Sequence, residues 1–229
     1  MSSSTAAQHL ANHTIQPFVT RLARWWNTRS VVAIKRTIDV AAVAPALLLI
    51  SPFFLLVALA IKLEDGGPVL YWQKRVGLNG RVFSFPKFRS MRTDSDAVRQ
   101  QIEHLNQHGE SLTFKMKNDP RITRVGKLLR RTSMDELPQL MCVLNGDMTL
   151  VGPRPPMEAE VAQYTLADRR RLSVTPGLTC IWQVSGRSNI PFPKQAAMDV
   201  DYIRERSISL DIRLLLATVP AVLFGRGAY

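Results

Sequence analysis

Residues 40–61 read VAAVAPALLLISPFFLLVALAI, an uncharged apolar run with Ser51 and Pro52 near its middle. An α-helix rises about 1.5 Å per residue, so a run of this length could just cross a hydrocarbon core of about 30 Å. Pro52 has no amide hydrogen, and in a regular helix its ring clashes with the carbonyl of Leu48. The sequence therefore predicts a membrane helix broken at Ser51-Pro52, with the Ser51 hydroxyl satisfying part of the backbone that the proline leaves unpaired.

Basic residues flank this apolar run on both sides. They are Arg21, Arg24, Arg29, Lys35 and Arg36 before it, and Lys62, Lys74, Arg75, Arg81, Lys87 and Arg89 after it. Basic residues beside a membrane segment tend to stay in the cytoplasm, so both flanks favour a re-entrant helix that enters and leaves on one face. A kinked helix that spans the bilayer is the alternative, because proline is tolerated in membrane helices. The length and uniform apolar character disfavour a buried soluble helix.

The composition favours an anionic partner. The 229 residues include 30 Lys or Arg against 18 Asp or Glu, a formal net charge of +12, and the sequence pI is about 10.4. Beside a membrane segment, lipid headgroups and phosphorylated substrates are better candidates than nucleic acid, which we do not expect as a partner. Cys142 and Cys180 have neither disulfide-framework nor zinc-site spacing, as in a reducing cytoplasm.

The chain divides into three predicted parts. Residues 1–30 form a flexible segment that ends near Trp25-Trp26, a pair expected either at the lipid headgroups or packed on the protein. Residues 31–64 form a membrane anchor, which begins too late and is too long for a cleaved signal peptide. Residues 65–229 form a cytoplasmic catalytic domain at the membrane surface.

The catalytic domain is predicted to be α+β and mainly helical. Apolar spacing at i, i+3, i+4 and i+7 indicates helices, and short alternating runs around a turn indicate strands. The last helix could lie in the core or in the membrane interface. The predicted strands cover residues 69–72 and 81–85, and the predicted helices cover residues 95–109, 124–131, 137–144, 157–172 and 210–224.

Two adjacent acids, Asp135 and Glu136, follow two arginines within RRTSMDELP at residues 130–138. One interpretation is structural, since Ser133 and Glu136 match a helix capping box. The other is chemical, because a helix dipole and nearby arginines keep a carboxylate ionised. An ionised carboxylate can attack phosphorus, and it can hold Mg²⁺, which prefers oxygen ligands and bridges phosphates.

Further basic groups stand beside proline or glycine turns, which can fix an arginine fork against a diphosphate. These segments are residues 87–89, 152–155 and 176–187. No phosphate-binding glycine loop, dinucleotide fingerprint or nucleophile elbow is present in the sequence. The four histidines, His9, His13, His104 and His108, are expected to be solvated.

In this order, the motifs resemble those of the small monotopic bacterial phosphoglycosyl transferases, also called the bacterial sugar transferase family. The resemblance covers the chain from about Lys35 to the C-terminus. The matching segments are Lys35-Arg36-x-x-Asp39, Ser51-Pro52, Gly67-Pro68-Val69, Lys87-Phe88-Arg89-Ser90-Met91, Leu128-x-Arg130, Asp135-Glu136-Leu137-Pro138-Gln139-Leu140, Gly146-Asp147-Met148, Val151-Gly152-Pro153-Arg154-Pro155, Pro176-Gly177-Leu178-Thr179, Gln183-Val184-Ser185-Gly186-Arg187 and Asp199-x-x-Tyr202.

The resemblance implies an enzyme of exopolysaccharide synthesis at the cytoplasmic face of the bacterial inner membrane. It implies transfer of a sugar-1-phosphate from a UDP-sugar to undecaprenyl phosphate, with release of UMP and with a re-entrant anchor broken at Ser51-Pro52. Asp135 falls on the family's nucleophile and Glu136 on its partner, with Mg²⁺ held at the pair. Phosphate or nucleotide-sugar contacts are expected from Lys87, Arg89, Arg130, Pro153, Arg154, Gln183 and Arg187.

Some questions stay open at this point. Glucose and galactose are the leading sugars by resemblance alone, and homo-oligomer formation is not decided. Cys180 departs from the expected glycine and puts the local turn geometry in doubt. A non-catalytic membrane-tethered module that binds anionic lipid or nucleic acid would explain the charge and the anchor, but not the Asp135-Glu136 pair. A polytopic-type transferase is disfavoured by the single apolar run.

Overall fold

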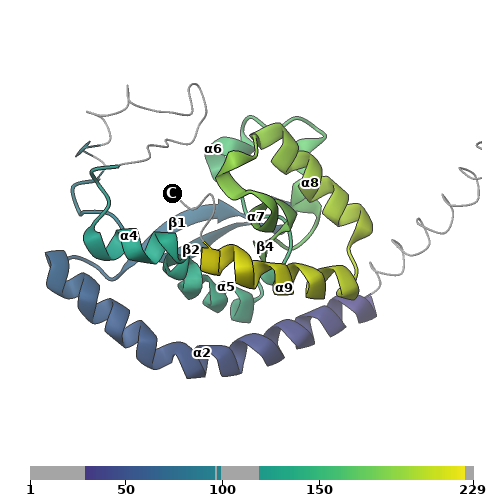
Figure 1. Ribbon diagram of the computed structural model, residues 1–229. Coiled ribbons are helices and arrows are strands. Elements are labelled where there is room, and N and C mark those ends of the chain that lie inside the picture. Colours follow the sequence, from purple (N-terminus) through teal and green to yellow (C-terminus); the bar gives the residue numbers. More distant parts are fainter. Residues whose placement is uncertain (1–28, 96, 99–118, 225–229) are drawn as a thin grey trace, which may run out of the picture.

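The computed structural model describes residues 29–95, 97–98 and 119–224. The expectations for Trp25-Trp26 and for the four histidines lie outside the described residues, as does most of the predicted helix at 95–109. Elsewhere the chain is mostly helical with a few strands, as predicted (Figure 1).

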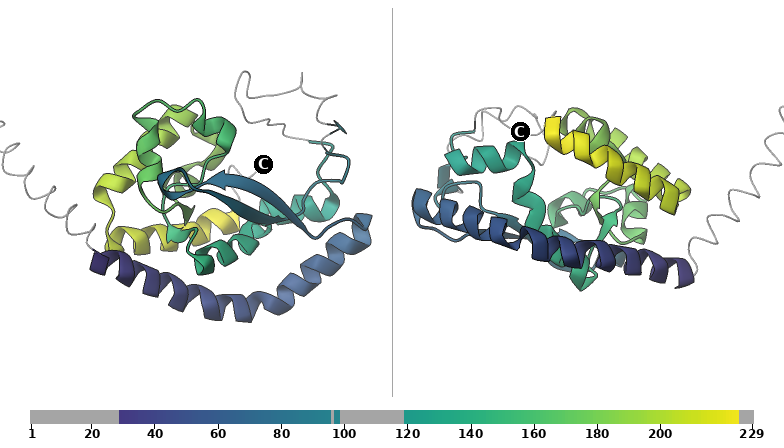
Figure 2. Two further views of the ribbon diagram at one scale, coloured as in Figure 1. Left: turned by 180° about the vertical axis from the view of Figure 1, so that it is seen from behind. Right: turned by 60° about the horizontal axis from the view of Figure 1, so that its bottom comes forward.

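The apolar run lies within α2 (Arg29–Asp65), a single helix of 37 residues that contains Pro45 and Pro52. The Ser51 hydroxyl donates a 2.8 Å hydrogen bond to the carbonyl oxygen of Leu48. Pro52 cannot supply an amide donor to that oxygen, so this part of the prediction is confirmed. The predicted break into two half-helices is wrong, because α2 continues through the proline and curves along one side of the chain (Figures 1 and 2).

Among the described residues, α2 is the one helix long and apolar enough to cross a membrane. One face of α2 is exposed and apolar: Leu48 and Leu49 are 77% and 83% exposed. The other face packs on the rest of the chain through Val43, Val57 and Ile61, each at most 7% exposed. A bare apolar face of this extent marks a surface that needs a lipid or protein neighbour.

Two strands, β1 (Leu70–Val76) and β2 (Val82–Phe88), form an antiparallel hairpin in the register Leu70↔Phe88 to Val76↔Val82. A short 3₁₀ turn, η1 (Leu78–Gly80), joins them, as the glycine-rich turn predicted. Phe83 and Phe85 of β2 pack in one cluster with Val43 of α2, while Phe88 packs in another with Val57 and Ile61. The hairpin is therefore fixed to the inner face of the apolar helix.

A second pairing, between β3 (Thr149–Val151) and β4 (Gly177–Thr179), is parallel and brings distant segments together. A Cβ atom on Gly177 would lie 2.0 Å from the amide nitrogen of Gly152. Only glycine permits this approach, which places the residues after β3 against the Pro176-Gly177 turn.

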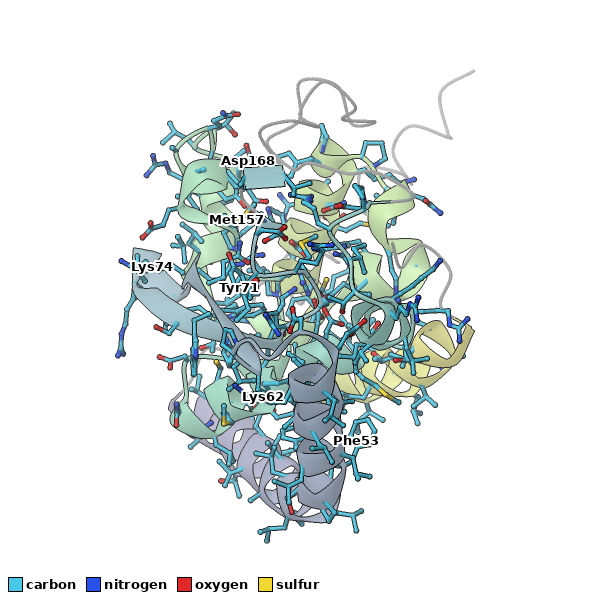
Figure 3. The ribbon with its side chains drawn as sticks, turned by 90° about the vertical axis from the view of Figure 1, so that its left-hand side faces the viewer. Phe53, Lys62, Tyr71, Lys74, Met157 and Asp168 are labelled. Atoms are coloured by element: carbon cyan, nitrogen blue, oxygen red, sulfur yellow. The ribbon has the colours of Figure 1, made fainter. Side chains whose placement is uncertain are left out.

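Short helices complete the chain around these strands. The predicted helix at 157–172 is two separate pieces, because Thr165 and Asp168 exchange side-chain and backbone hydrogen bonds at 2.6 to 3.2 Å and start a new turn there. In Figure 3, Phe53 of α2 lies in the lower part of the view and Asp168 lies near the top. The elements are α4 (Arg124–Arg131), η3 (Met134–Gln139), α5 (Leu140–Asn145), α6 (Glu158–Val161), η4 (Asp168–Ser173), α7 (Ile181–Ser185), η5 (Arg187–Asn189), α8 (Phe192–Glu205) and α9 (Ile208–Phe224).

Candidate active site

Asp135 and Glu136 lie in the first turn of η3, directly after a sharp change of chain direction. Ser133, between α4 and η3, has a left-handed backbone with φ 57°, which a non-glycine residue rarely adopts. Within the described residues Ser133 makes no capping hydrogen bond, and its hydroxyl accepts one from Arg187 at 3.2 Å. The capping box is therefore not formed, and both of its side chains face the site instead.

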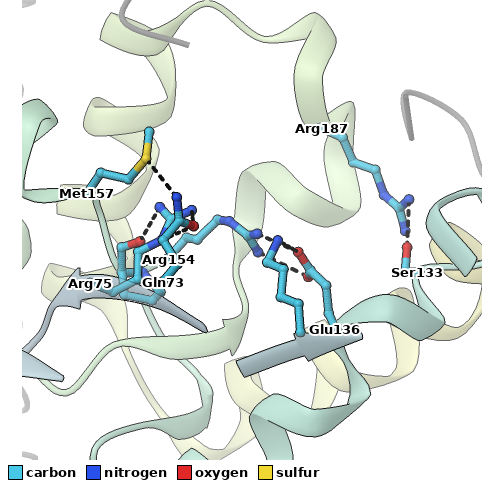
Figure 4. A network of polar contacts seen from close by, with 9 residues as sticks. Gln73, Arg75, Ser133, Glu136, Arg154, Met157 and Arg187 are labelled. Atoms are coloured by element: carbon cyan, nitrogen blue, oxygen red, sulfur yellow. Dashed lines mark hydrogen bonds and ion pairs between the residues drawn. The ribbon is translucent and has the colours of Figure 1, made fainter. Parts of the chain in front are cut away.

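The Glu136 carboxylate is held by two cations from separate elements. Lys87 of β2 donates to its Oε1 at 3.0 Å, and Arg154, after β3, donates to Oε1 and Oε2 at 2.5 and 3.2 Å (Figure 4). Burial alone would raise the pKa of the Glu136 carboxyl, but Arg154 and Lys87 outweigh it and hold the pKa well below its usual range. Glu136 is thus a fixed anion whose charge is already matched.

Asp135, one residue earlier, has a different environment. Its residue is 9% exposed, and among the described residues its carboxylate accepts no hydrogen bond and forms no ion pair. Burial raises the pKa of Asp135 to about 6, with Glu136 adding to the rise and Lys87, Arg130 and Arg154 opposing it. Near neutral pH the group is therefore mostly ionised, and no hydrogen bond from residues 29–95, 97–98 or 119–224 holds it.

The remaining predicted residues lie at different distances from this pair. Arg187 reaches the edge of the site through Ser133 and has a left-handed backbone itself, with φ 52°. The Oε1 of Gln183 accepts a hydrogen bond from the Cys180 thiol at 3.0 Å, on the buried side of α7. Cys180 has extended backbone angles that any residue adopts, so the departure from glycine strains nothing.

Arg89 is not brought to the carboxylate pair. It forms an ion pair with Asp65 at the end of α2, and its guanidinium fills the space beside Gly67. Pro153 is fully buried, so it shapes the turn that presents Arg154. The structure therefore gathers Lys87, Arg130, Arg154 and, at the edge, Arg187 around the two acids.

Arg75 of β1 belongs to the same polar network, although the sequence indicated only a flanking charge. Its guanidinium donates to the Pro155 carbonyl at 3.1 Å and to Gln73 Oε1 at 2.8 and 3.1 Å (Figure 4). Burial and the neighbouring charge of Arg154 lower the pKa of Arg75 to about 10. The alternation of the strand was the available signal, because Gln73 and Arg75 share one face.

The donor set suits a magnesium ion only in part. No group of three or more His, Cys, Asp or Glu side chains is gathered within the described residues. Mg²⁺ is commonly held by one or two carboxylates together with substrate phosphates, which a single carboxylate such as Asp135 can satisfy. Both Glu136 oxygens already accept hydrogen bonds, so Asp135 is the better ligand of the two.

Together, these features define a membrane-associated protein with a cationic site around two carboxylates. Comparison with known proteins gives the class more narrowly. Residues 30–225 match the bacterial sugar transferase family, and the chain belongs to that family, which confirms the resemblance.

Several curated relatives are similar over most of the chain. It is 46% identical over 195 residues to the galactosyl transferase CpsE of Streptococcus agalactiae, covering 85% of this chain but 43% of that relative. It is 42% identical over 198 residues to the exopolysaccharide production protein ExoY of Rhizobium meliloti, covering 85% of this chain and 88% of ExoY. It is 40% identical over 203 residues to the UDP-glucose:undecaprenyl-phosphate glucose-1-phosphate transferase of Caulobacter vibrioides, covering 85% and 72%.

Proposed function

We propose that this protein transfers a sugar-1-phosphate from a UDP-sugar to undecaprenyl phosphate and releases UMP, as a membrane step of exopolysaccharide synthesis. The observation that carries the proposal is the contrast at the site: Asp135 is ionisable and has no hydrogen-bond partner in the described part of the chain, whereas the adjacent Glu136 is bound by Lys87 and Arg154. The name of the Caulobacter vibrioides relative supports this reaction, and the name of ExoY, which has a similar length, supports a role in exopolysaccharide production.

The chemistry is a double displacement at phosphorus. An Asp135 oxygen forms a bond to the phosphorus that bears the sugar. The bond between this phosphorus and the bridging oxygen of the diphosphate breaks, and UMP leaves with the bridging oxygen. A phosphate oxygen of the lipid then attacks the same phosphorus, which returns Asp135 as a carboxylate and yields the lipid diphosphate sugar. Lys87, Arg154 and Arg187 lower the repulsion between the diphosphate and the attacking anion.

A magnesium ion is part of the proposal, with Asp135 as its first protein ligand and Glu136 as the second. When bound, Mg²⁺ would neutralise charge that develops on the diphosphate. In the same proposal Arg130, in the last turn of α4, contacts a phosphate, while Gln183 and Pro153 shape the nucleotide-sugar side of the site. Arg89 contributes by holding the end of α2.

The anchor is proposed to be re-entrant, because residues near both ends of the apolar run in α2 contact the rest of the folded chain. At one end, Asp39 binds residues of β3, and at the other Glu64 accepts from the amides of Arg124 and Val125 in α4 at 2.6 and 3.1 Å. Asp39 and Glu64, about 38 Å apart along the helix, thus contact two elements of the same folded chain, β3 and α4, which supports entry and exit on one membrane face.

The site then lies at the cytoplasmic surface of the inner membrane. In α9, the exposed side chains of Ile212, Leu216 and Val219 suit a helix lying in the lipid interface. The acceptor phosphate lies at that surface too, so a re-entrant anchor holds Asp135 at the same depth as the acceptor phosphate.

The test is UMP release from purified enzyme, across a panel of UDP-sugars, with and without polyprenyl phosphate. We expect UDP-glucose or UDP-galactose to give turnover only when the lipid phosphate and Mg²⁺ are present. Salt-sensitive binding of anionic lipid with no UMP from any UDP-sugar would instead favour a non-catalytic binding module.

A further inference from the structure

A buried carboxylate in the membrane helix contacts the strand that leads to the site. Asp39, which is 4% exposed, accepts a 2.6 Å hydrogen bond from the Thr149 hydroxyl and a 3.2 Å hydrogen bond from the Leu150 amide. These are the first two residues of β3. A buried carboxylate is costly unless it is hydrogen-bonded, so these two contacts mark a specific junction between α2 and β3.

The third residue of β3 is held by a second series of polar contacts, which also begins in α2. Lys35 forms an ion pair with Oδ2 of Asp211 in α9. Oδ1 of Asp211 lies 2.7 Å from the Tyr202 hydroxyl, which lies 3.0 Å from the carbonyl oxygen of Val151. Every residue of β3 is thus held by a side-chain contact. Both sets of contacts begin on the same turn of α2, at Lys35 and Asp39.

The same turn of α2 holds the element that follows the acid pair. Arg36 donates hydrogen bonds to the carbonyl oxygens of Val143 and Leu144, which end α5. Helix-terminal carbonyls lack intrahelical partners, and a cation there also complements the helix dipole. Because α5 continues directly from η3, this contact fixes the position of the C-terminal end of the η3–α5 segment, which carries Asp135 and Glu136.

From these contacts we infer that the Lys35-Arg36-x-x-Asp39 turn is a positioning device, in which Asp39 holds β3 and thereby sets Arg154 on Glu136. The path is short, since only Gly152 and Pro153 separate the strand from Arg154, and Gly152 lies so close to Gly177 that an added Cβ would stand 3.0 Å from the Gly177 amide nitrogen. The helix is then more than an anchor, because it fixes one wall of the site. The inference rests on the proposed function, and it deepens the role of the same site.

The experiment combines two variants in a double-mutant cycle. Asp39→Asn should raise the KM for the UDP-sugar about tenfold or more, because small misplacements of a binding group have large kinetic effects. In an Arg154→Lys background the same change should alter KM less than about twofold, since residues that act through one another are not additive. Thr37→Ala is the matched control, as Thr37 is exposed on the same helix and its hydroxyl donates, within the described residues, to the Ala33 carbonyl alone, at 3.1 Å.

A merely structural role predicts something else: fewer folded molecules, a lower apparent kcat and an unchanged KM. An unchanged KM in Asp39→Asn, or the same increase in both backgrounds, overturns the inference. If Asp39→Asn does not fold, Thr149→Val removes one of the two hydrogen bonds at nearly constant volume and takes its place, with the same KM result expected.

Hydrogen exchange separates this inference from the proposed function, because it needs no activity. The backbone amides of Leu150, Val151, Gly152 and Arg154 should exchange faster in Asp39→Asn, or in Thr149→Val, than in wild type and in Thr37→Ala. Equal exchange in all of them overturns the positioning role. Absence of UMP release from wild-type enzyme would overturn the proposed function alone.

Discussion

Asp135 and Glu136 are adjacent in the chain, yet only Glu136 is held by cations. Arg154 and Lys87 donate three hydrogen bonds to Glu136 at 2.5 to 3.2 Å, whereas Asp135 accepts none within the described part of the chain. The pKa values of the pair move in opposite directions: Asp135 upward and Glu136 downward. Such a separation of pKa values fits the proposed mechanism, in which Glu136 organises the cations and Asp135 reacts.

Glu136→Gln should reduce turnover on the order of a hundredfold, because Arg154 and Lys87 lose the charge that orients them. If Glu136 acted only as a helix cap, the change would cost about 1 kcal/mol of stability and leave kcat nearly intact. Steady-state UMP release distinguishes these outcomes. Glu158→Gln, at an exposed position in α6, is the control and should behave as wild type.

Arg187→Lys should raise the KM for the UDP-sugar about tenfold or more, because lysine keeps the charge but loses the planar fork that suits a diphosphate. Arg187 donates to Ser133 Oγ at 3.2 Å, so its guanidinium is already directed toward the acid pair. Arg169→Lys, at an exposed site on η4, is the matched control. Equal KM values for wild type and Arg187→Lys would mean that Arg187 is only a solvated charge.

Asp199→Asn should lower the free energy of unfolding by about 3–5 kcal/mol, because it leaves a buried guanidinium without its anionic partner. Asp199 pairs with Arg171 at 2.6 Å, with side chains 0% and 4% exposed. Thermal unfolding in detergent measures the change. Asp201→Asn is the control, since its 3.6 Å pair with Arg204 is solvent-exposed and should contribute 1 kcal/mol or less. Equal unfolding of the two variants would argue against a structural role for the buried pair.

The sequence predicted the hairpin, α4 and the apolar helix, because each depends on local periodicity and turn residues. It named Lys87 and Arg154 as phosphate or nucleotide-sugar contacts, but it did not predict that both donate hydrogen bonds to Glu136. It did not predict the partners of Arg89 and Gln183, which depend on contacts of the folded chain. Arg89 is 24 residues from Asp65, and no local pattern indicates which of several basic residues reaches that carboxylate.

The continuity of α2 was misjudged for a physical reason. The sequence predicts that the Ser51 hydroxyl satisfies part of the backbone beside Pro52 and still predicts a break, whereas this one hydrogen bond to the Leu48 carbonyl accompanies a helix that continues through the proline. Arg75 was missed as part of the site because its partners, Gln73 and the Pro155 carbonyl, are neutral. A search for charge pairs in the sequence does not find a guanidinium bound by uncharged acceptors.

Pro52→Ala should straighten α2 and move some molecules toward a spanning topology, if the bend favours the re-entrant form. Single cysteines near Thr28 and near Asn79 report the outcome through an impermeant thiol reagent in intact cells. Both should be shielded in the otherwise wild-type protein, in which Cys142 and Cys180 are buried. Labelling of the N-terminal position alone would contradict the re-entrant topology. An unchanged topology in Pro52→Ala would assign the effect to the basic flanks.

Asp135 should carry a phosphosugar when the enzyme meets a UDP-sugar without lipid acceptor. One UMP at most should be released per enzyme molecule, because the acceptor is needed to clear the adduct. Asp135→Asn keeps the shape of the side chain but removes the attacking anion, so it should abolish both this burst and steady turnover.

Mass spectrometry of trapped enzyme decides the matter, because it locates the added mass on a residue. Glu136→Gln is the informative comparison, since it retains Asp135 and should still form the adduct, though slowly. An adduct on Asp135 in that variant would separate the reacting carboxylate from the organising one. If the wild-type enzyme turns over with no adduct on Asp135, or if Asp135→Asn remains active, the lipid phosphate attacks the UDP-sugar directly and Asp135 serves only to hold cations.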